Sequence, residues 1–233
     1  MAARIEAGSG DELTVAYRRL NAAYQQTLRY AEDVRRLYQQ VQRAIYQSLL
    51  GLANALEAKD HYTRGHSERV ARMAGRLARA RSLSDSFVQT VAQAGLLHDL
   101  GKIGIPEAIL RKPAPLTGPE WEAMRQHPVV GAQIVAPLEF FAEGAIIVRH
   151  HHERVDGSGY PDGLAGEAIP LGARIVAIAD VYDALTPDRP YRPRLSHAQA
   201  IDQLRAQAGR TLDSELIETF CALLSDEYPE PAL

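Results

Sequence analysis

Between Leu13 and Leu52 the chain follows a heptad pattern, in which apolar or small side chains recur at alternating steps of four and three residues. The positions are Leu13, Tyr17, Leu20, Tyr24, Thr27, Ala31, Val34, Tyr38, Val41, Ile45, Ser48 and Leu52. No proline interrupts the pattern. A helix of about 40 residues would be about 60 Å long, which is more than a small globular domain needs.

We therefore predict that residues 1–50 form a helix that pairs with a second copy of the chain as a coiled coil, giving a homodimer and a surface for a regulatory protein partner. The alternative is a long surface helix that folds back on its own domain, because Thr27, Ala31 and Ser48 would make a weak seam.

The rest of the chain is predicted to be an all-α domain over residues 51–225, with a tail over residues 226–233. The length of 233 residues and the 46% of apolar residues suit one domain with a buried core plus an extension. Helical spacing recurs beyond Leu52, and no segment shows the repeated alternation that is typical of β-strands. The glycine-rich segment from Glu153 to Gly172 is predicted to be a loop, with a short hairpin as the alternative.

The net charge of −3 provides no general attraction for nucleic acid or anionic lipid, so we expect no DNA partner and only local phosphate binding. The single cysteine, Cys221, and a start without the apolar core of a signal peptide favour the cytoplasm. The longest uncharged stretch, Ala44 to Leu56, has 13 residues, which is too short for a membrane span.

Histidine is concentrated in one part of the chain, since seven of the eight histidines lie between His61 and His152. His98 and Asp99 end an apolar helical segment, where a buried aspartate would be costly unless it met a cation. A salt bridge from Asp99 to an arginine is the alternative. His150 to His152 precede the glycine-rich loop, although three adjacent surface histidines can also be accidental.

Single imidazoles and carboxylates elsewhere complete this set. His66 and His127 lie on other helical segments, and Asp180 lies in an apolar one, with Asp183 on the same helical face. Imidazole and carboxylate without thiolate suit a hydrolytic site for hard or borderline divalent ions. The number of donors suits two ions, a recurring arrangement in the hydrolysis of phosphate esters.

Three cations near these groups indicate an anionic substrate. Lys102 lies four residues after His98, and Arg189 and Arg192 follow Asp180 on a proline-rich segment. Guanidinium groups bind phosphate oxygens through paired hydrogen bonds, although a solvated basic turn is the alternative. The residues by themselves predict a metal-dependent phosphoesterase and leave the ester open.

Several motifs in order resemble the HD-GYP domain, a branch of the HD phosphohydrolase superfamily. The matching segments are ALEAKDHYTRGHSERVARMAGRLA, AGLLHDLGKIGIPEAILRKPAPLT, QHPVVGAQIV, HHERVDGSGYPDGLAGEAIPLGARIVAIADVYDALT and DRPYRPR. The resemblance covers residues 50–223. It implies an HD-domain helical bundle that hydrolyses cyclic di-GMP to pGpG, and in many members on to GMP, with a metal-bridging hydroxide as the nucleophile. It also implies a centre of iron, manganese or both.

The resemblance assigns roles to individual residues. The implied metal ligands are His66, His98, Asp99, His127, His151, His152 and Asp180, with Asp99 as the bridge between two ions. His98, Asp99 and Lys102 are the implied catalytic residues. The implied substrate-binding residues are Lys102, Gly159, Tyr160, Pro161, Arg189 and Arg192.

The family pattern also separates bystanders from ligands. His61, His150 and His197 fall outside the ligand positions. Some members hold a third metal through a carboxylate four residues before the first histidine, where this chain has Tyr62, so we expect two metals. The alternatives are a non-catalytic module that binds cyclic di-GMP and a hydrolase of another cyclic dinucleotide.

Overall fold

The computed structural model describes residues 3–57, 65–186 and 194–227, with side chains over 12–57, 65–186 and 194–225. The α-helices are α1 (Ala3–Glu57), α2 (His66–Ala80), α3 (Asp85–Leu97), α4 (Glu107–Leu110), α5 (Gly118–Met124), α6 (His127–Val135), α7 (Ala142–His150), α8 (Leu171–Leu185), α9 (His197–Arg205) and α10 (Ser214–Glu227). The 3₁₀ helices are η1 (Leu100–Gly104), η2 (Glu139–Phe141) and η3 (Gly166–Ala168).

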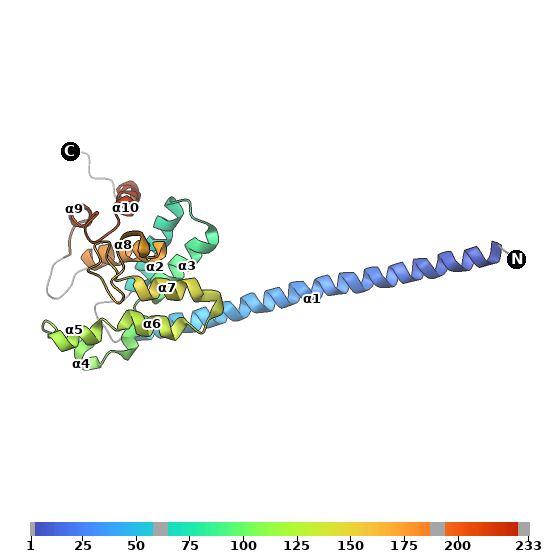
Figure 1. Ribbon diagram of the computed structural model, residues 1–233, viewed down its shortest axis with the longest axis horizontal. Coiled ribbons are helices and arrows are strands. Elements are labelled where there is room, and N and C mark those ends of the chain that lie inside the picture. Colours follow the sequence, from blue (N-terminus) through green and yellow to red (C-terminus); the bar gives the residue numbers. More distant parts are fainter. Residues whose placement is uncertain (1–2, 58–64, 187–193, 228–233) are drawn as a thin grey trace. The chain divides into compact units, whose positions relative to one another are not determined.

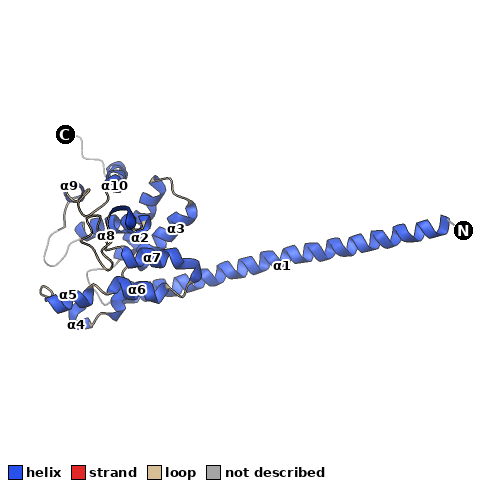
Figure 2. Cartoon of the chain, viewed as in Figure 1, coloured by secondary structure: helices blue, strands red, loops and turns tan. Residues whose placement is uncertain are grey.

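The all-α prediction is confirmed, because the described residues contain helices and no strand (Figure 2). The glycine-rich loop between α7 and α8 contains a single antiparallel bridge, between Asp156 and Ala165, so the hairpin alternative is reduced to one residue pair. None of the described helices is both long and apolar enough to cross a membrane.

The chain divides into two compact units, Met1–Ser48 and Leu49–Leu233. The described residues of the first unit, 3–48, belong to α1, an uninterrupted helix of 55 residues. The large apolar side chains of its heptad positions are exposed in this chain: Leu13, Tyr17, Leu20, Tyr24, Val34, Tyr38 and Val41. The division after residue 50 stays a prediction, and residues 228–233 of the predicted tail lie outside the described part of the chain.

The core of the second unit is a group of helices in which α2 and α3 pack on each other and on α8, and α3 and α8 also pack on α7 (Figure 1). The helix α2 is amphipathic and buries Val70 and Leu77 on one face. In contrast, α8 is apolar over most of its surface, and nine of its 15 residues are buried while none is fully exposed, as expected of a helix packed against several others. Each large apolar side chain buried in this way contributes about 1.5–3 kcal/mol to folding.

The helix α6 packs against η1 and α7. These elements carry or adjoin several of the predicted ligands. Gly101 of η1 lies directly against the backbone of α6, and a Cβ built on it would be 1.9 Å from the carbonyl oxygen of His127. There is no room for a side chain at this contact. Because residue 101 is a glycine, the segment after α3 can lie next to the start of α6.

Candidate metal centre

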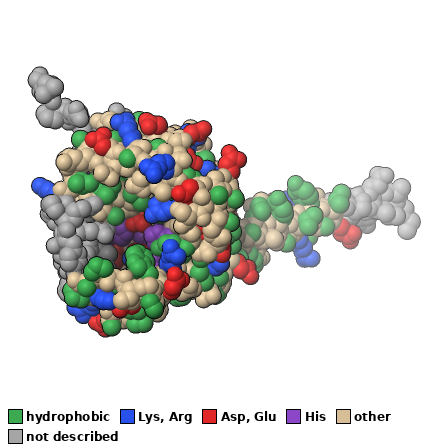
Figure 3. Space-filling model, turned by 60° about the vertical axis from the view of Figure 1, so that its left-hand side comes forward, with side chains coloured by type: hydrophobic (Ala, Val, Ile, Leu, Met, Phe, Trp, Pro, Cys, Tyr) green, Lys and Arg blue, Asp and Glu red, His purple; other side chains and the backbone are tan. Residues whose placement is uncertain are grey.

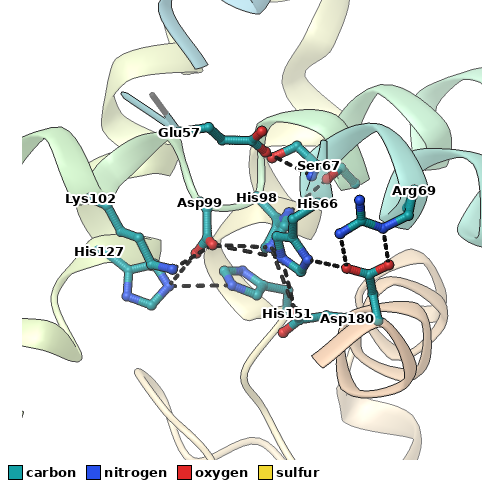
Figure 4. A network of polar contacts seen from close by, with 12 residues as sticks. Glu57, His66, Ser67, Arg69, His98, Asp99, Lys102, His127, His151 and Asp180 are labelled. Atoms are coloured by element: carbon teal, nitrogen blue, oxygen red, sulfur yellow. Dashed lines mark hydrogen bonds and ion pairs between the residues drawn. The ribbon is translucent and has the colours of Figure 1, made fainter. Parts of the chain in front are cut away.

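The second unit brings together all seven predicted ligands, which come from five separate segments of the chain. Figure 4 labels six of them, all except His152. Most of them lie at helix ends, where a side chain can point away from the core of its own helix. His66 begins α2, His98 and Asp99 follow α3, His127 begins α6, His151 and His152 follow α7, and Asp180 lies within α8.

The ligand atoms form two adjoining groups. Asp99, His127, His151 and His152 make one group, and His66, His98 and Asp180 make the other; within each group the atoms lie within 4.8 Å of one another.

Asp99 lies between these groups and faces both. Its Oδ1 is 3.3 Å from His127 Nε2, and its Oδ2 is 3.4 Å from His98 Nε2. A carboxylate with one oxygen toward each group has the orientation that a ligand shared by two cations requires.

The histidine rings are oriented so that their Nε2 atoms face the centre. Nδ1 of His98 donates to the carbonyl of Gly95, that of His127 to Met124 and that of His151 to Val148, at 2.6–2.7 Å. Because Nδ1 carries the hydrogen, Nε2 of each neutral ring presents a lone pair.

These lone pairs are too close to one another without a positive charge between them. Nε2 of His127 lies 3.4 Å from Nε2 of His151, and Nε2 of His66 lies 3.3 Å from Nε2 of His98. Two nitrogens bound to one ion at about 2.1 Å would lie about 3 Å apart, so both pairs fit coordination to a shared cation. The donor set of imidazole and carboxylate therefore fits divalent metal ions.

The electrostatics of the cluster favour neutral imidazoles on one side and positive charge on the other. Burial lowers the pKa of His127 to about 4 and that of His152 to about 3, so both rings are available as ligands. Burial also opposes charge on His66, but hydrogen bonds to Asp180 and Asp183 raise its pKa to about 10. Its Nε2 is thus a position where the protein favours a cation, either a proton or a metal ion.

Asp99 is ionised and pairs with a lysine. Burial opposes its charge, but Lys102 and the imidazole of His98 hold its pKa well below the ordinary value. The Nζ of Lys102 lies 2.6 Å from Asp99 Oδ2, whereas the alternative from the sequence was a salt bridge to an arginine. Lys102 therefore lies within contact of the predicted bridging carboxylate.

Asp183 supports His66 without joining either ligand group. This buried aspartate accepts a hydrogen bond from His66 Nδ1 at 2.7 Å and binds Arg69 through both of its oxygens, at 2.6 and 2.9 Å. The sequence placed Asp183 on the same helical face as Asp180, three residues before it. It could not show that Asp183 binds His66, which is 117 residues away in the sequence. A carboxylate behind a histidine fixes the tautomer and the orientation of the ring.

We expect Asp183→Asn to weaken metal binding about 10–100-fold, the usual effect of losing such a supporting carboxylate. The measurement is a titration of metal against a chelator. Asp213→Asn is the matched control, because Asp213 makes a comparable ion pair with Arg174, at 2.6 Å, outside the metal centre. Equal metal affinities in the two variants would contradict this role of Asp183.

Glu57 was also missed by the sequence interpretation. Its two carboxylate oxygens accept the backbone N–H groups of Gly65 and Ser67, each at 2.8 Å, at the start of α2 (Figure 4). A carboxylate at this end of a helix satisfies free N–H groups and complements the helix dipole. Glu57 thereby holds the turn that carries His66.

Of the predicted substrate-binding residues Gly159, Tyr160 and Pro161, the structure shows the ring of Tyr160 beside the histidines of the centre. The ring of Tyr160 lies 4.8 Å from the ring of His152, and its backbone N–H donates to the carbonyl of His152. A Cβ on Gly159 would come within 2.4 Å of the backbone nitrogen of Arg154, so glycine is required for this approach.

A buried glutamate holds the rest of this loop in place. Glu153 accepts the backbone N–H groups of Asp162 and Leu164 at 2.7 and 3.0 Å. The sequence interpretation used Glu153 only as part of a motif, and nothing local indicated where its carboxylate would bind.

The histidines predicted to be bystanders that the structure describes lie outside both ligand groups. His150 Nε2 contacts Asp162 at 2.9 Å, and His197 forms a hydrogen bond with the hydroxyl of Tyr182. His61, Tyr62, Arg189 and Arg192 lie outside the described residues, so their predicted roles stay predictions.

The cluster is accessible from the surface. In Figure 3, histidine and acidic side chains lie at the base of a hollow on the face of the second unit. Asp99 and Asp180 keep 15% and 18% of their side-chain surface exposed, whereas His98 keeps 1%. Both carboxylates are thus partly open to solvent at the centre.

Comparison with known proteins identifies the family of this fold and site. The HD domain family matches residues 51–216, which is most of the chain. The chain belongs to the HD domain family. The resemblance to its HD-GYP branch is confirmed by a relative in Xanthomonas campestris, the cyclic di-GMP phosphodiesterase response regulator RpfG, which is 45% identical over 174 residues, or 74% of this chain and 46% of that protein.

Other members of the HD family act on a different dinucleotide. The 3′3′-cGAMP-specific phosphodiesterase 2 of Vibrio cholerae is 41% identical, over 72% of this chain and 32% of that protein. A solved structure of a cyclic GMP-AMP-specific phosphodiesterase from V. cholerae shares the fold, with a TM-score of 0.63 at 21% identity over 79% of this chain and 49% of that one. The HD chain described here spans less than half the length of each of these proteins.

Proposed function

We propose that this HD-family chain is a metal-dependent phosphodiesterase that hydrolyses cyclic di-GMP to pGpG, with further cleavage to GMP as a second step. The observation that carries the proposal is the pair of ligand groups that share Asp99 at the base of a surface hollow. The name of the X. campestris relative supports cyclic di-GMP as the substrate.

The proposed metal ligands are His66, His98, Asp99, His127, His151, His152 and Asp180, which would hold two divalent ions, iron or manganese. Bound ions supply Lewis acidity and a nucleophile from water near neutral pH. The chain contributes orientation: Asp183 holds the ring of His66, and backbone carbonyls hold the rings of His98, His127 and His151, with Nε2 turned to the centre. Lys102 adds a positive charge next to Asp99, where a phosphodiester anion would approach.

Further residues are proposed to bind the substrate. Tyr160 presents an aromatic ring beside His152, and aromatic rings of this kind stack on nucleobases. Gly159 and Pro161 shape the same wall. Arg189 and Arg192 are proposed to contact phosphate, as the family motif implies.

Hydrolysis of 3′3′-cGAMP is the second candidate, because two V. cholerae proteins of the same fold are named for that dinucleotide. A non-catalytic binding module is less well supported, since both ligand groups have their complete set of donors.

The test is hydrolysis by the purified chain loaded with manganese or with iron under anaerobic conditions. Cyclic di-GMP, 3′3′-cGAMP and cyclic di-AMP are supplied separately, and pGpG, GMP and the corresponding adenine products are followed by chromatography. We expect the fastest cleavage with cyclic di-GMP. A protein with full metal content that binds cyclic di-GMP and leaves it intact would instead be a binding module.

We further propose that the heptad face of α1 joins two copies of the chain as a coiled coil. Large apolar side chains at these positions are exposed in the single chain, including Leu20 at 70% and Val34 at 65%. A coiled coil buries such residues between helices.

In light scattering we expect the full chain to be a dimer and the double variant Leu20→Glu/Val34→Glu to be a monomer. Val15→Glu is the control, because Val15 is exposed on α1 outside the heptad positions. A double variant that remains dimeric would show that another surface joins the subunits.

A further inference from the structure

Arg125 places a cation on the aromatic wall of the metal centre. It follows α5 directly, and its guanidinium carbon lies 5.2 Å from the centroid of the Tyr160 ring. The Tyr160 ring lies 4.8 Å from the ring of His152 and 6.5 Å from that of His127. Arg125 is therefore separated from the predicted metal ligands by a single aromatic ring.

The hydrogen-bond donors of Arg125 are largely unused. Its side chain is 45% exposed, and its polar side-chain contact within the described residues is an ion pair with Glu122 at 3.8 Å, longer than a hydrogen bond. Arg149, in contrast, is bound by both oxygens of Asp162 at 2.7 and 2.8 Å. A guanidinium with free N–H groups in a fixed plane is suited to a ligand with two adjacent acceptors.

Guanine and adenine differ in this respect. Guanine offers two acceptors, O6 and N7, along one edge, and arginine binds both of them. Adenine offers one acceptor and one donor on the same edge, which suits glutamine or asparagine and leaves an arginine donor opposed by an amino group. A base that stacks on Tyr160 would take the place of the guanidinium on the ring, and the long exposed side chain could then bind the edge of the base.

We infer that Arg125 is a specificity-determining residue, which selects guanine over adenine for the base held at Tyr160. This inference rests on the proposed hydrolysis of a cyclic dinucleotide and names the residue that chooses among such substrates. It applies to a single base site, so a dinucleotide with one guanine still satisfies it.

The test replaces Arg125 by glutamine, which has the amide that pairs with adenine. We expect Arg125→Gln to lower kcat/KM for cyclic di-GMP about tenfold or more, the effect of losing one bidentate base contact. For cyclic di-AMP we expect kcat/KM to stay the same or to rise. Arg125→Lys keeps the charge and loses the paired hydrogen bonds, so its preference for guanine should fall as well. Metal content and the melting temperature are measured for every variant and should match the original chain.

Arg154→Gln is the matched control. Burial and the charges of Asp99 and Asp180 raise the pKa of Tyr160, while Arg125 and Arg154 both act to lower it, so each arginine supplies positive charge near this ring. Within the described part of the chain, the cation–π contact of Tyr160 is with Arg125 and not with Arg154. Replacement of Arg154 should change kcat/KM by similar factors for cyclic di-GMP, 3′3′-cGAMP and cyclic di-AMP. The ratios of kcat/KM among these three dinucleotides should therefore stay the same.

The outcomes separate this inference from the proposed function. If the original chain cleaves cyclic di-GMP and Arg125→Gln keeps the same ratio of kcat/KM among the three dinucleotides, the role of Arg125 is wrong and the proposed function stands. If the original chain cleaves none of them, the proposed hydrolysis fails. The inference is then decided by calorimetric titration of the original chain and of Arg125→Gln with the same dinucleotides. If the ratio of the dissociation constants for cyclic di-GMP and cyclic di-AMP is the same in both proteins, the inference is wrong.

Discussion

Replacement of Asp99 by alanine is expected to remove the bound metal and to lower kcat at least about 10³-fold, because metal ions contribute several kcal/mol to transition-state stabilisation. Asp99 has one oxygen 3.3 Å from His127 and the other 3.4 Å from His98, so its loss affects both ligand groups at once. It also removes the carboxylate that Lys102 contacts at 2.6 Å. Metal content by mass spectrometry and hydrolysis of cyclic di-GMP measure the two effects.

Asp202→Ala is the control for Asp99→Ala, because Asp202 is an exposed aspartate on α9 outside both ligand groups. The control should retain full metal content and full activity. If Asp99→Ala also retained two metal ions per chain and cleaved cyclic di-GMP at the original rate, the shared-ligand role of Asp99 would be wrong.

Gly101→Ala is expected to have the largest effect on stability. The added Cβ would lie 1.9 Å from the carbonyl oxygen of His127 and 2.4 Å from the backbone nitrogen of Gly131, and neither backbone atom can rotate away as a flexible side chain could. Overpacking costs about 1–3 kcal/mol and more in severe cases, so we expect a loss of about 3 kcal/mol or more. For a chain of this size that corresponds to a decrease in melting temperature of roughly 10 °C.

The same substitution should also weaken metal binding, because separating η1 from α6 moves His127 away from Asp99. Gly118→Ala is the matched control, since Gly118 begins α5 and a Cβ there meets no atom within 4 Å. We expect the control to change stability by less than about 0.5 kcal/mol. Thermal unfolding and metal titration of the two variants test this, and equal melting temperatures would contradict the close contact at Gly101.

The chemistry of the site could be predicted because it depends on the types of residue present. A cation is indicated by residue type and position in the sequence. His98 and Asp99 follow an apolar helix, two histidines precede a loop, and Asp180 lies in an apolar helix. The motif order then predicted which histidines join the site, and the structure brings His66, His127, His151 and His152 together with the pair. His150, one residue away, instead contacts Asp162.

The supporting residues could not be predicted because their partners are distant in the sequence. Asp183 holds His66 from 117 residues away, and Arg125, directly after α5, reaches Tyr160 in the loop between α7 and α8. Periodicity places Asp183 on the same face as Asp180, but it does not show which ring that face meets. Glu57 and Glu153 are similar, since each binds backbone N–H groups of a turn whose path depends on the packing around it.

The sequence by itself determined the all-α fold, the long heptad helix and the types of metal ligand, because helical periodicity and side-chain chemistry are local properties of the chain. Only the tertiary structure decided that Asp99 faces two ligand groups, that the Nε2 atoms converge, and that Arg125 lies on Tyr160. These features depend on the packing of helices against one another and on contacts such as that of Gly101 with α6. A misplacement of about 1 Å is enough to impair a site of this kind, and no local sequence pattern encodes a distance of that size.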